Sequence, residues 1–264
     1  MNNTKKPLLD VVFASDKRKN ILLLLQDGPR KIEELLESMD TSRQALLPQI
    51  RILEDHYLIN RSDDAYELTR VGKLLFDEIY QLLSTIEVFD GNTDYWGSHS
   101  LDFIPPHLLK RIKKMGKCEQ VKLSLTESYQ LNQDVVETTF ISENFFVITS
   151  FFHPDYPRVF HEMVSKKVTI HIIVHKNVFE KMQKDHREHF QKLINGGYFK
   201  LYVYPEKMGF QVIAHNDYLL LLRLLTKEEE VDIKHMLCSN PEALEWATEL
   251  FDHYCKDAAP VSKL

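Results

Sequence analysis

Residues 41–72 read TSRQALLPQIRILEDHYLINRSDDAYELTRVG, and this stretch decides the fold of the first part of the chain. Thr41 and Gln44 fit a capping box, in which the two side chains satisfy free backbone N–H groups at the start of a helix. The apolar residues that follow recur at helical spacing as far as residue 56. Two short apolar runs then flank a polar turn at 62–64, which predicts a small hairpin.

Short helices are predicted on the N-terminal side of this stretch. Apolar residues recur at helical spacing within 9–13, and Ser15 fits the cap of a second short helix. Gly28 and Pro29 end that helix, and 31–39 reads as an amphipathic helix. Helices in this order, followed by a hairpin, predict a winged helix-turn-helix module whose 41–56 helix enters a DNA major groove.

The order and spacing of these residues resemble the winged helix-turn-helix regulators of archaea and bacteria. The matching positions are Ile21-Leu22, Gly28-Pro29, Ile32 to Leu36, Ser42-Arg43, Ile50, Leu53-Glu54, Leu58-Ile59, Tyr66 to Thr69 and Gly72. Two positions depart from the pattern. Pro48 removes a backbone hydrogen bond inside the helix and predicts a kink, and Tyr57 stands where the family usually carries glycine.

The resemblance implies that the early, exposed positions of the 41–56 helix contact DNA bases. Arg43 suits guanine, and Gln44 or Gln49 suits adenine, through pairs of hydrogen bonds. The Gln44 side chain is equally suited to the helix cap and to hydrogen bonds with a base, and both alternatives stay open. Cations in the helix and in the hairpin suit phosphates. The residues expected to contact double-stranded DNA are Ser42, Arg43, Gln44, Leu47, Pro48, Gln49, Arg51 and Arg61.

A longer helix is predicted from Thr69 to Phe89, because apolar residues recur there at three- and four-residue steps. So apolar a helix at the edge of a small domain needs a partner. A second copy of the same helix is the simplest partner, which predicts a homodimer. The polar and aromatic residues 91–100 predict a hinge, and the two prolines at 105–106 predict the start of a helix over 107–115.

Strands alternate with helices in the rest of the chain. The predicted strands are 120–125, 145–151, 168–174, 198–203, 211–214 and 218–224. The predicted helices are 133–140, 157–165, 177–194 and 241–254. This alternation predicts an α/β layered domain. The whole chain is therefore expected to be an α+β multi-domain protein, with a winged helix-turn-helix at 1–72, linker or dimerisation helices at 73–117 and an α/β effector or regulatory domain at 118–264.

The run 193–225 and the closing segment 241–246 resemble the middle domain of methanogen regulators of the filament and methanogenesis-regulatory type. This resemblance implies an archaeal transcription factor whose C-terminal domain is similar in fold to phospholipase D-like proteins. Phospholipase D chemistry needs a histidine nucleophile and a lysine two residues later. No His-x-Lys occurs in the sequence, and the comparable position reads His215-Asn216-Asp217.

We therefore expect a sequence-specific transcription regulator whose second domain is not an enzyme, because phosphoryl transfer needs the nucleophile and the cation. Two alternatives stay open at this stage. One is a phosphodiester-processing enzyme of phospholipase D-like fold. The other is a protein-interaction scaffold without DNA binding.

Aromatic and polar residues at the end of the predicted strand 145–151 indicate a second binding site, because the carboxyl ends of strands in α/β sheets collect ligands. The residues expected to line a pocket for a small-molecule or protein effector are Phe151, Phe152, His153, Asp155 and His175. The alternative is that these rings fill the core. The histidine spacings at 171/175 and 186/189 permit a metal, but no clustered carboxylate or cysteine accompanies them, so neither a metal nor a cofactor is expected.

Charge and composition limit the class further. The formal net charge of -6 argues against a general nucleic-acid coat. Residues 1–70 hold 11 Lys and Arg against 12 Asp and Glu, so DNA contact must be local and reinforced by dimerisation. No run approaches the roughly 20 apolar residues of a membrane span, and 1–6 is polar, so a cytoplasmic protein without membrane contact is expected. Cys118, Cys238 and Cys255 lack paired spacings and are expected to be reduced thiols.

Overall fold

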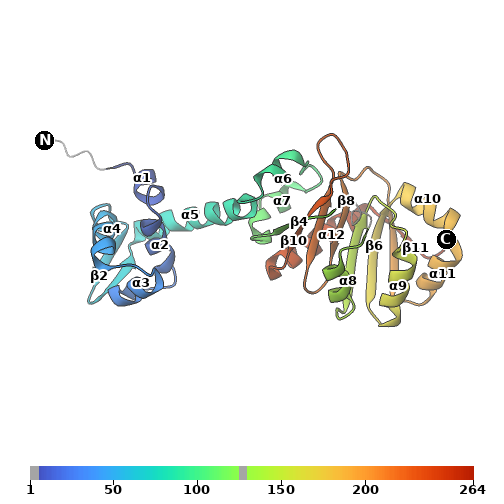
Figure 1. Ribbon diagram of the computed structural model, residues 1–264, viewed down its shortest axis with the longest axis horizontal. Helices are drawn as coiled ribbons and strands as arrows, with labels where there is room; N and C mark the ends of the chain where they lie inside the picture. Colours follow the sequence, from blue (N-terminus) through green and yellow to red (C-terminus); the bar gives the residue numbers. More distant parts are fainter. Residues whose placement is uncertain (1–5, 125–129) are drawn as a thin grey trace. The chain divides into compact units, whose positions relative to one another are not determined.

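The computed structural model describes residues 6–124 and 130–264, and the chain divides into two compact units at 83/84. Helix α5 (Arg70–Phe89) contains this boundary. Its Phe76 side chain is buried in the core of the first unit, and its Val88 side chain is buried in the core of the second. Figure 1 shows helices and a small sheet in the first unit and a large sheet with helices in the second. The predicted α+β multi-domain class is confirmed.

The first unit is a group of short helices with a small antiparallel sheet. Its elements before α5 are α1 (Leu8–Phe13), α2 (Asp16–Leu24), β1 (Arg30–Lys31), α3 (Ile32–Ser38), α4 (Arg43–Asp55), β2 (Ile59–Ser62) and β3 (Ala65–Leu68). The strands pair in the order β1-β3-β2, so β2 and β3 form the predicted hairpin. Leu46, Ile50 and Leu53 of α4 are buried against α2 and α3, as the helical spacing of the sequence predicts.

The second unit is built around a large mixed sheet. Its helices are α6 (Thr93–Ser98), α7 (Pro106–Leu109), the 3-10 helix η1 (Ile112–Met115), α8 (Gln133–Thr139), α9 (Tyr156–Ser165), α10 (Lys176–Asp185), α11 (Arg187–Asn195) and α12 (Pro241–Asp257). Its strands are β4 (Glu119–Lys122), β5 (Asn144–Thr149), β6 (Thr169–His175), β7 (Phe199–Tyr204), β8 (Phe210–His215), β9 (Leu220–Leu224), β10 (Lys234–Cys238) and β11 (Ala259–Val261).

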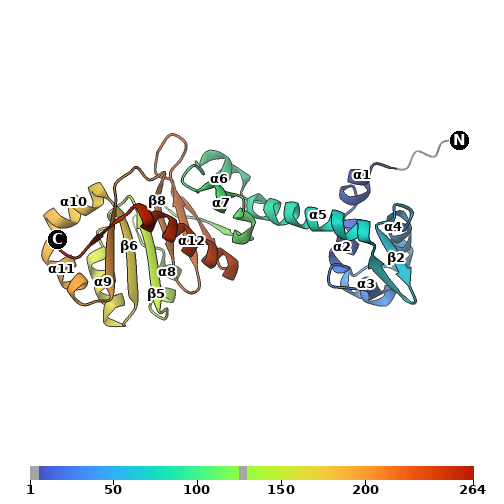
Figure 2. The same cartoon turned by 180° about the vertical axis from the view of Figure 1, so that it is seen from behind.

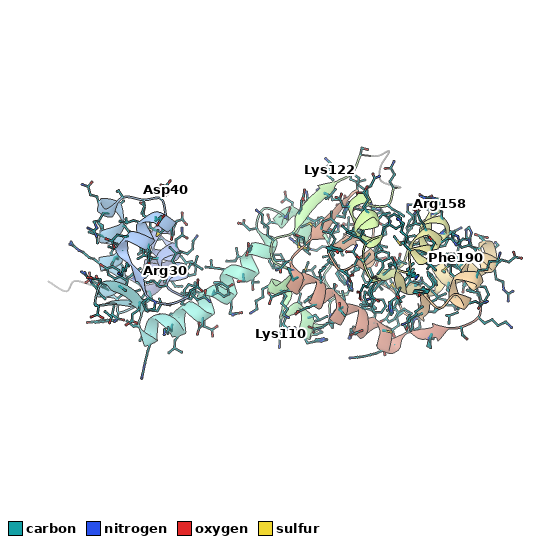
Figure 3. All side chains as sticks on the ribbon, turned by 90° about the horizontal axis from the view of Figure 1, so that it is seen from below. Arg30, Asp40, Lys110, Lys122, Arg158 and Phe190 are labelled. Carbon is teal, nitrogen blue, oxygen red and sulfur yellow. A yellow bond between two sulfur atoms is a disulfide. The ribbon has the colours of Figure 1, made fainter. Side chains whose placement is uncertain are left out.

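The strands lie in the order β11-β7-β6-β5-β8-β9-β10-β4, and β5, β6 and β7 are parallel while the other pairs are antiparallel. Each face of this sheet is covered by helices. Helices α8 to α11 pack on one face, where Phe190 is fully buried, and α12 packs on the other around Trp246. Helix α9 lies in front of the sheet in Figure 1 and α12 in front of it in Figure 2, and Phe190 is labelled in Figure 3.

The predicted cap of the recognition helix is wrong by one residue. Helix α4 begins at Arg43, and its N-cap is Ser42, whose hydroxyl accepts a hydrogen bond of 3.3 Å from the Ala45 N–H. Serine caps helices as well as threonine does, so the sequence did not distinguish Ser42 from Thr41. As a result, the exposed Gln44 side chain is not used in the predicted capping box.

The predicted hinge at 91–100 is also wrong, because these residues form α6 and contribute to the core of the second unit. The Tyr95 ring is fully buried, and the Trp96 indole donates a hydrogen bond of 3.0 Å to the Val88 carbonyl. The predicted helix over 107–115 is divided into α7 and η1, and the one over 177–194 is divided into α10 and α11 at His186. The backbone of His186 has φ -139°, which no helix accommodates.

Two short strands of the second unit were not predicted, and one of them brings two cysteines together. Strand β10 pairs with β4, and this places Cys118 beside Cys238, 120 residues later, in a disulfide. The expectation of reduced thiols is therefore wrong for this pair, because only the strand pairing makes the residues neighbours. Cys255 is a free thiol. The other unpredicted strand, β11, is an edge strand. Leu125, the last residue of the predicted strand 120–125, lies outside the described residues.

Across the described residues, no helix combines the length and the apolar character that crossing a bilayer requires.

Candidate nucleic-acid interface

The outward side of α4 carries most of the residues predicted to contact DNA. Ser42, Arg43, Gln44, Pro48 and Arg51 are exposed. Gln44, Pro48 and Arg51 lie on the side of the helix opposite the buried Leu46, Ile50 and Leu53, because successive residues turn by about 100°. Ser42 and Arg43 are exposed because they lie at the start of the helix. Leu47, between them on the helix surface, is half-buried. The structure therefore exposes Ser42, Arg43 and Gln44 at the start of α4, and Pro48 and Arg51 on its following turns.

Arg43 is held by an acidic neighbour rather than by the core. Its Nη2 atom lies 3.0 Å from Glu33 Oε1 of α3, and the two side chains are 58% and 70% exposed. Exposed pairs of this kind contribute about 0–1 kcal/mol. The guanidinium can therefore leave Glu33 for a guanine edge or a phosphate at little cost.

Gln49 differs from the other predicted base-reading residues because its side chain points inward. Its Oε1 atom accepts hydrogen bonds from Arg18 Nη1 at 2.6 Å and from Ser15 Oγ at 3.4 Å. The buried Arg18 also donates to the Val11 and Asp10 carbonyls, so Gln49 is part of a junction between α1, α2 and α4. Pairing of Gln49 with adenine would break both hydrogen bonds. The helical position of Gln49, one turn from Leu53 and Leu46, carried this signal in the sequence.

Two arginines of the predicted set are suited to contacts with DNA phosphates. Arg51 is exposed and forms no ion pair with any described residue. Arg61 lies on β2, the first strand of the wing, with its Nη2 atom 3.3 Å from Asp64 Oδ1 and its Cζ atom 6.0 Å from the centroid of the Tyr66 ring. Both partners of Arg61 belong to the wing itself. The wing therefore fixes the position of the Arg61 side chain, which stays exposed.

The junction between the wing and α5 explains two positions of the sequence pattern. Gly72 packs against the wing so closely that a Cβ atom there would lie 1.9 Å from the Leu58 carbonyl oxygen. Tyr57 has φ 57°, in the left-handed region that glycine adopts without strain. This is the physical reason that glycine suits position 57. Helix α4 continues through Pro48 to Asp55.

The residues predicted to line an effector pocket do not gather at one place. Phe151 and His153 line a small cavity of the second unit. Phe152 packs in the core, with its ring stacked 5.0 Å from that of His186. Asp155 is exposed, and His175 caps α10 by accepting a hydrogen bond of 3.2 Å from the Asn177 N–H. Of the five predicted residues, Phe151 and His153 therefore line the cavity, and the other three lie elsewhere.

The cavity also contains a residue that the sequence analysis missed. Arg223 lies on β9 within the run YLLLLRLL at 218–225, and it lines the cavity together with His235 of β10. A cation inside an otherwise apolar strand is the signal that was available, because lone arginines are seldom placed in a buried strand without a polar partner.

The position expected for a phospholipase D motif holds structural residues. His215 is buried, with its ring stacked 4.7 Å from that of Phe146, and burial lowers the pKa of His215 to about 4. Asn216 donates hydrogen bonds from Nδ2 to Thr138 and Thr139 of α8. Within the described residues, no group of three or more His, Cys, Asp or Glu side chains is arranged to hold a metal ion.

Helix α4 with its wing, followed by an α/β unit, defines a protein of the winged helix-turn-helix class with an appended domain. Residues 7–87 match the family described as methanogenesis regulatory protein FilR1, N-terminal domain, and residues 128–257 match the FilR1 middle domain. The chain belongs to the FilR1 family. This confirms the predicted resemblance to regulators of the methanogenesis-regulatory type.

Curated relatives show the same relationship. The methanogenesis regulatory protein FilR1 of Methanothrix harundinacea (strain 6Ac) is 22% identical over 251 residues, which cover 93% of this chain and 56% of that protein. The chain thus spans little more than half of that relative. The HTH-type transcriptional activator ArnR of Sulfolobus acidocaldarius is 31% identical over 98 residues, covering 37% of this chain and 36% of ArnR.

Solved structures show weaker likenesses. TrmBL2, described as an archaeal chromatin protein with a novel mode of DNA binding, aligns with 99% of this chain and 100% of its own, at a TM-score of 0.44 and 13% identity. Nuc of Salmonella typhimurium, a phospholipase D family member, aligns with 48% of this chain and 88% of its own, at a TM-score of 0.38 and 12% identity.

Proposed function

We propose that this chain is a sequence-specific DNA-binding transcription regulator that works as a homodimer and whose second unit senses an effector. The observation that carries the proposal is the exposed start of α4, where Arg43 and Gln44 project into solvent while Leu46, Ile50 and Leu53 of the same helix are buried. This is the arrangement in which a recognition helix reads a major groove. The names of the relatives, a methanogenesis regulatory protein and a transcriptional activator, support the same function.

The proposed base readers are Arg43 and Gln44, and the proposed phosphate contacts are Arg51 and Arg61. The remaining predicted residues of α4 are proposed to make van der Waals contacts with the wall of the groove. They are Ser42, Leu47 and Pro48. Gln49 is proposed to position α4 through Arg18 rather than to read a base. This assignment follows from which polar atoms are already bonded within the protein.

A homodimer is supported by the surface of α5. Val71, Leu74, Leu82 and Ile86 are 51%, 72%, 49% and 46% exposed, and at about 100° per residue they fall on one stripe of the helix. An apolar stripe of this kind fits a second copy of α5 packed across a two-fold axis. Two reading helices per complex would also offset the near-neutral charge of the DNA-binding unit.

The DNA-binding proposal is tested with two variants that break the same ion pair. Arg43→Ala should weaken binding to a selected site by roughly 10- to 100-fold, equivalent to about 1–3 kcal/mol for one bidentate base contact. Glu33→Gln should instead strengthen binding, because it frees Arg43 and removes a negative charge from the DNA-facing side. If these variants acted only through protein stability, both would shift the affinity in the same direction.

The measurement is a mobility-shift titration of the purified chain with duplexes that it selects from a random pool. Arg158→Ala is the matched control, because Arg158 is an exposed, ion-paired arginine on α9 of the second unit (Figure 3). It should leave the affinity unchanged. Failure to select any duplex, or equal affinities for Arg43→Ala and the wild type, would overturn the proposal.

The dimer is tested separately by analytical ultracentrifugation. Leu74→Lys places a charge in the exposed apolar stripe and should shift the protein to monomers, whereas Asp77→Lys changes an exposed residue on another side of α5 and should not. Equal sedimentation of Leu74→Lys and the wild type as dimers would place the interface elsewhere.

A binding role for the second unit, rather than a catalytic one, is supported by the state of His215. The ring is stacked in the core and its pKa is lowered by burial, so it is neither exposed as a nucleophile nor followed by the lysine that phospholipase D chemistry requires. Hydrolysis of a generic phosphodiester that disappears in His215→Ala would contradict this part of the proposal.

A further inference from the structure

The second unit contains a small cavity with a cluster of polar side chains in its wall, on the side of the sheet that α8 to α11 cover; it is called the polar cavity below. Its wall is formed by the start of α8, by α9 and by strands β8, β9 and β10. The cavity has a volume of about 40 Å³, more than the about 10–15 Å³ that one water requires. Its polar lining includes Arg223, His235, Gln211 and Tyr156.

Arg223 is a partly buried cation in the wall of this cavity. No described carboxylate forms an ion pair with it, and its Nε atom is buried without a hydrogen-bond partner among the described residues. The side chain projects from β9 to the same side of the sheet as Leu221, because alternate residues of a strand share a face. Burial lowers the pKa of Arg223, but a guanidinium stays charged at neutral pH. A guanidinium whose Nε atom is withdrawn from water is normally paired with an opposite charge.

The described residues that line the cavity with Arg223 include no carboxylate. His235 is fully buried, and its Nδ1 atom has no partner among the described residues. Burial, and then the neighbouring Arg223, lower the pKa of His235 to about 4, so the ring is neutral at pH 7. Gln211 is 6% exposed, and its Oε1 atom is likewise unpartnered. Burial raises the pKa of Tyr156 to about 12, so its phenol is also neutral.

An apolar cavity adjoins the polar one. The two share Leu131, Tyr156 and Leu221 in their walls, and the apolar cavity, of about 60 Å³, is otherwise lined by aliphatic and aromatic side chains such as Val147 and Phe160. No carboxylate of residues 6–124 or 130–264 lines the polar end, and the apolar end has space for a few carbon atoms. Both cavities are small beside the roughly 300–1,000 Å³ of pockets for drug-sized ligands, so nucleotides and polysaccharides do not fit.

We propose that these adjoining cavities together bind a small carboxylate with a short apolar chain, with the carboxylate at Arg223 and the chain between Leu221 and Phe160. The head group pairs with the guanidinium and receives a hydrogen bond from the His235 Nδ1–H, which is the donor nitrogen because Nε2 accepts from Asn132 Nδ2. The chain fills the apolar end without displacing a charged group. Only the role of this ligand as the effector of a regulator depends on the proposed function, since binding to the cavity does not require DNA.

The proposal is tested by isothermal titration calorimetry of the full chain with straight-chain carboxylates. Hexanoate should bind more tightly than butyrate, and butyrate more tightly than acetate, because each added methylene group is transferred from water into the apolar end of the cavity. Hexanol, which has the chain without the charge, and hexylammonium, which has the opposite charge, should not bind measurably. Inorganic phosphate tests the alternative that the cavity accepts any anion. Phosphate binding without hexanoate binding would overturn the proposal.

Two variants locate the site. Arg223→Met keeps the length of the side chain and should reduce hexanoate affinity at least tenfold, while thermal unfolding stays at or above the wild-type temperature because an unpaired buried charge is removed. Ala214→Val narrows the apolar end, which Ala214 lines, and should weaken hexanoate while leaving acetate unchanged. Arg158→Met, on the exposed surface of α9, is the matched control and should bind like the wild type. Unchanged hexanoate binding in Arg223→Met would refute the assignment of the head group.

The role of the ligand is measured afterwards with the DNA titration described above, repeated at saturating hexanoate. A change in DNA affinity that is absent in Arg223→Met supports an effector. Hexanoate binding with unaltered DNA affinity would refute the effector role while leaving the site intact. Absence of all DNA binding would contradict the proposed function and not the carboxylate site.

Discussion

Replacing Gly72 by alanine should destabilise the first unit through a backbone clash. The added Cβ would lie 1.9 Å from the Leu58 carbonyl oxygen and 2.9 Å from the Leu58 carbonyl carbon, whereas carbon atoms in ordinary contact are about 3.5–4.0 Å apart. Neither neighbour is a flexible side chain. The start of α5 and the wing must therefore separate by roughly an ångström or more to accept a methyl group.

The size of the effect follows from the bonds at this junction. The Leu58 carbonyl accepts hydrogen bonds from the Thr69 N–H at 3.0 Å and from Thr69 Oγ1 at 3.3 Å, and Thr69 Oγ1 in turn accepts from the Gly72 N–H at 2.9 Å. Overpacking costs about 1–3 kcal/mol, and each hydrogen bond lost costs about 1 kcal/mol. Alanine regains about 1 kcal/mol of helix propensity. The net loss in the free energy of unfolding should be about 2–3 kcal/mol.

Urea unfolding followed by far-UV circular dichroism measures this loss. Gly97→Ala is the matched control, because Gly97 lies in helix α6 and a Cβ there would meet nothing within 4 Å. It should be neutral or stabilising by up to about 1 kcal/mol. A Gly72→Ala protein as stable as the wild type would show that the contact between α5 and the wing is not as close as described.

Two further predictions concern backbone strain and buried histidines. Tyr57→Gly should stabilise the first unit by up to about 1 kcal/mol. The glycine relieves about 1–2 kcal/mol of left-handed backbone strain, but it raises the entropy cost of folding by about 0.5–1 kcal/mol. A lower urea midpoint than that of the wild type would contradict this. The pKa values of His215 and His235 are lowered from 6.5 to about 4 by burial, so the unfolded chain binds protons between these values and the folded chain does not. Stability is therefore full above pH 6.5 and falls as the pH drops toward 4, by about 2 kcal/mol for each histidine at pH 5. Urea midpoints at pH 7 and pH 5 measure the drop, and His215→Gln should remove about half of it; an equal drop in that variant would exclude His215 as its source.

Periodicity in the sequence was sufficient for the local elements. The helical spacing of Leu46, Ile50 and Leu53 predicted both the recognition helix and its buried side, and the polar turn at 62–64 predicted the wing. These features depend on neighbours a few residues apart, so the chain carries them in short segments. The errors at this level were small, such as a cap at Ser42 instead of Thr41, where two residues of similar capping strength stand side by side.

Contacts between segments that are far apart in the chain could not be predicted from the periodicity of the sequence. Nothing local to Cys118 indicates Cys238, and nothing local to Gln49 indicates that Arg18 occupies its oxygen. The short strand β10 gains its partners from β4 and β9 rather than from its own composition. By itself, the sequence determined most of the helices and strands and which of their sides are apolar, because those properties are set by neighbouring residues. Only the tertiary structure decided which polar atoms are already bonded and that Arg223 faces a cavity without an anion, because both depend on how strands and helices far apart in the chain pack together.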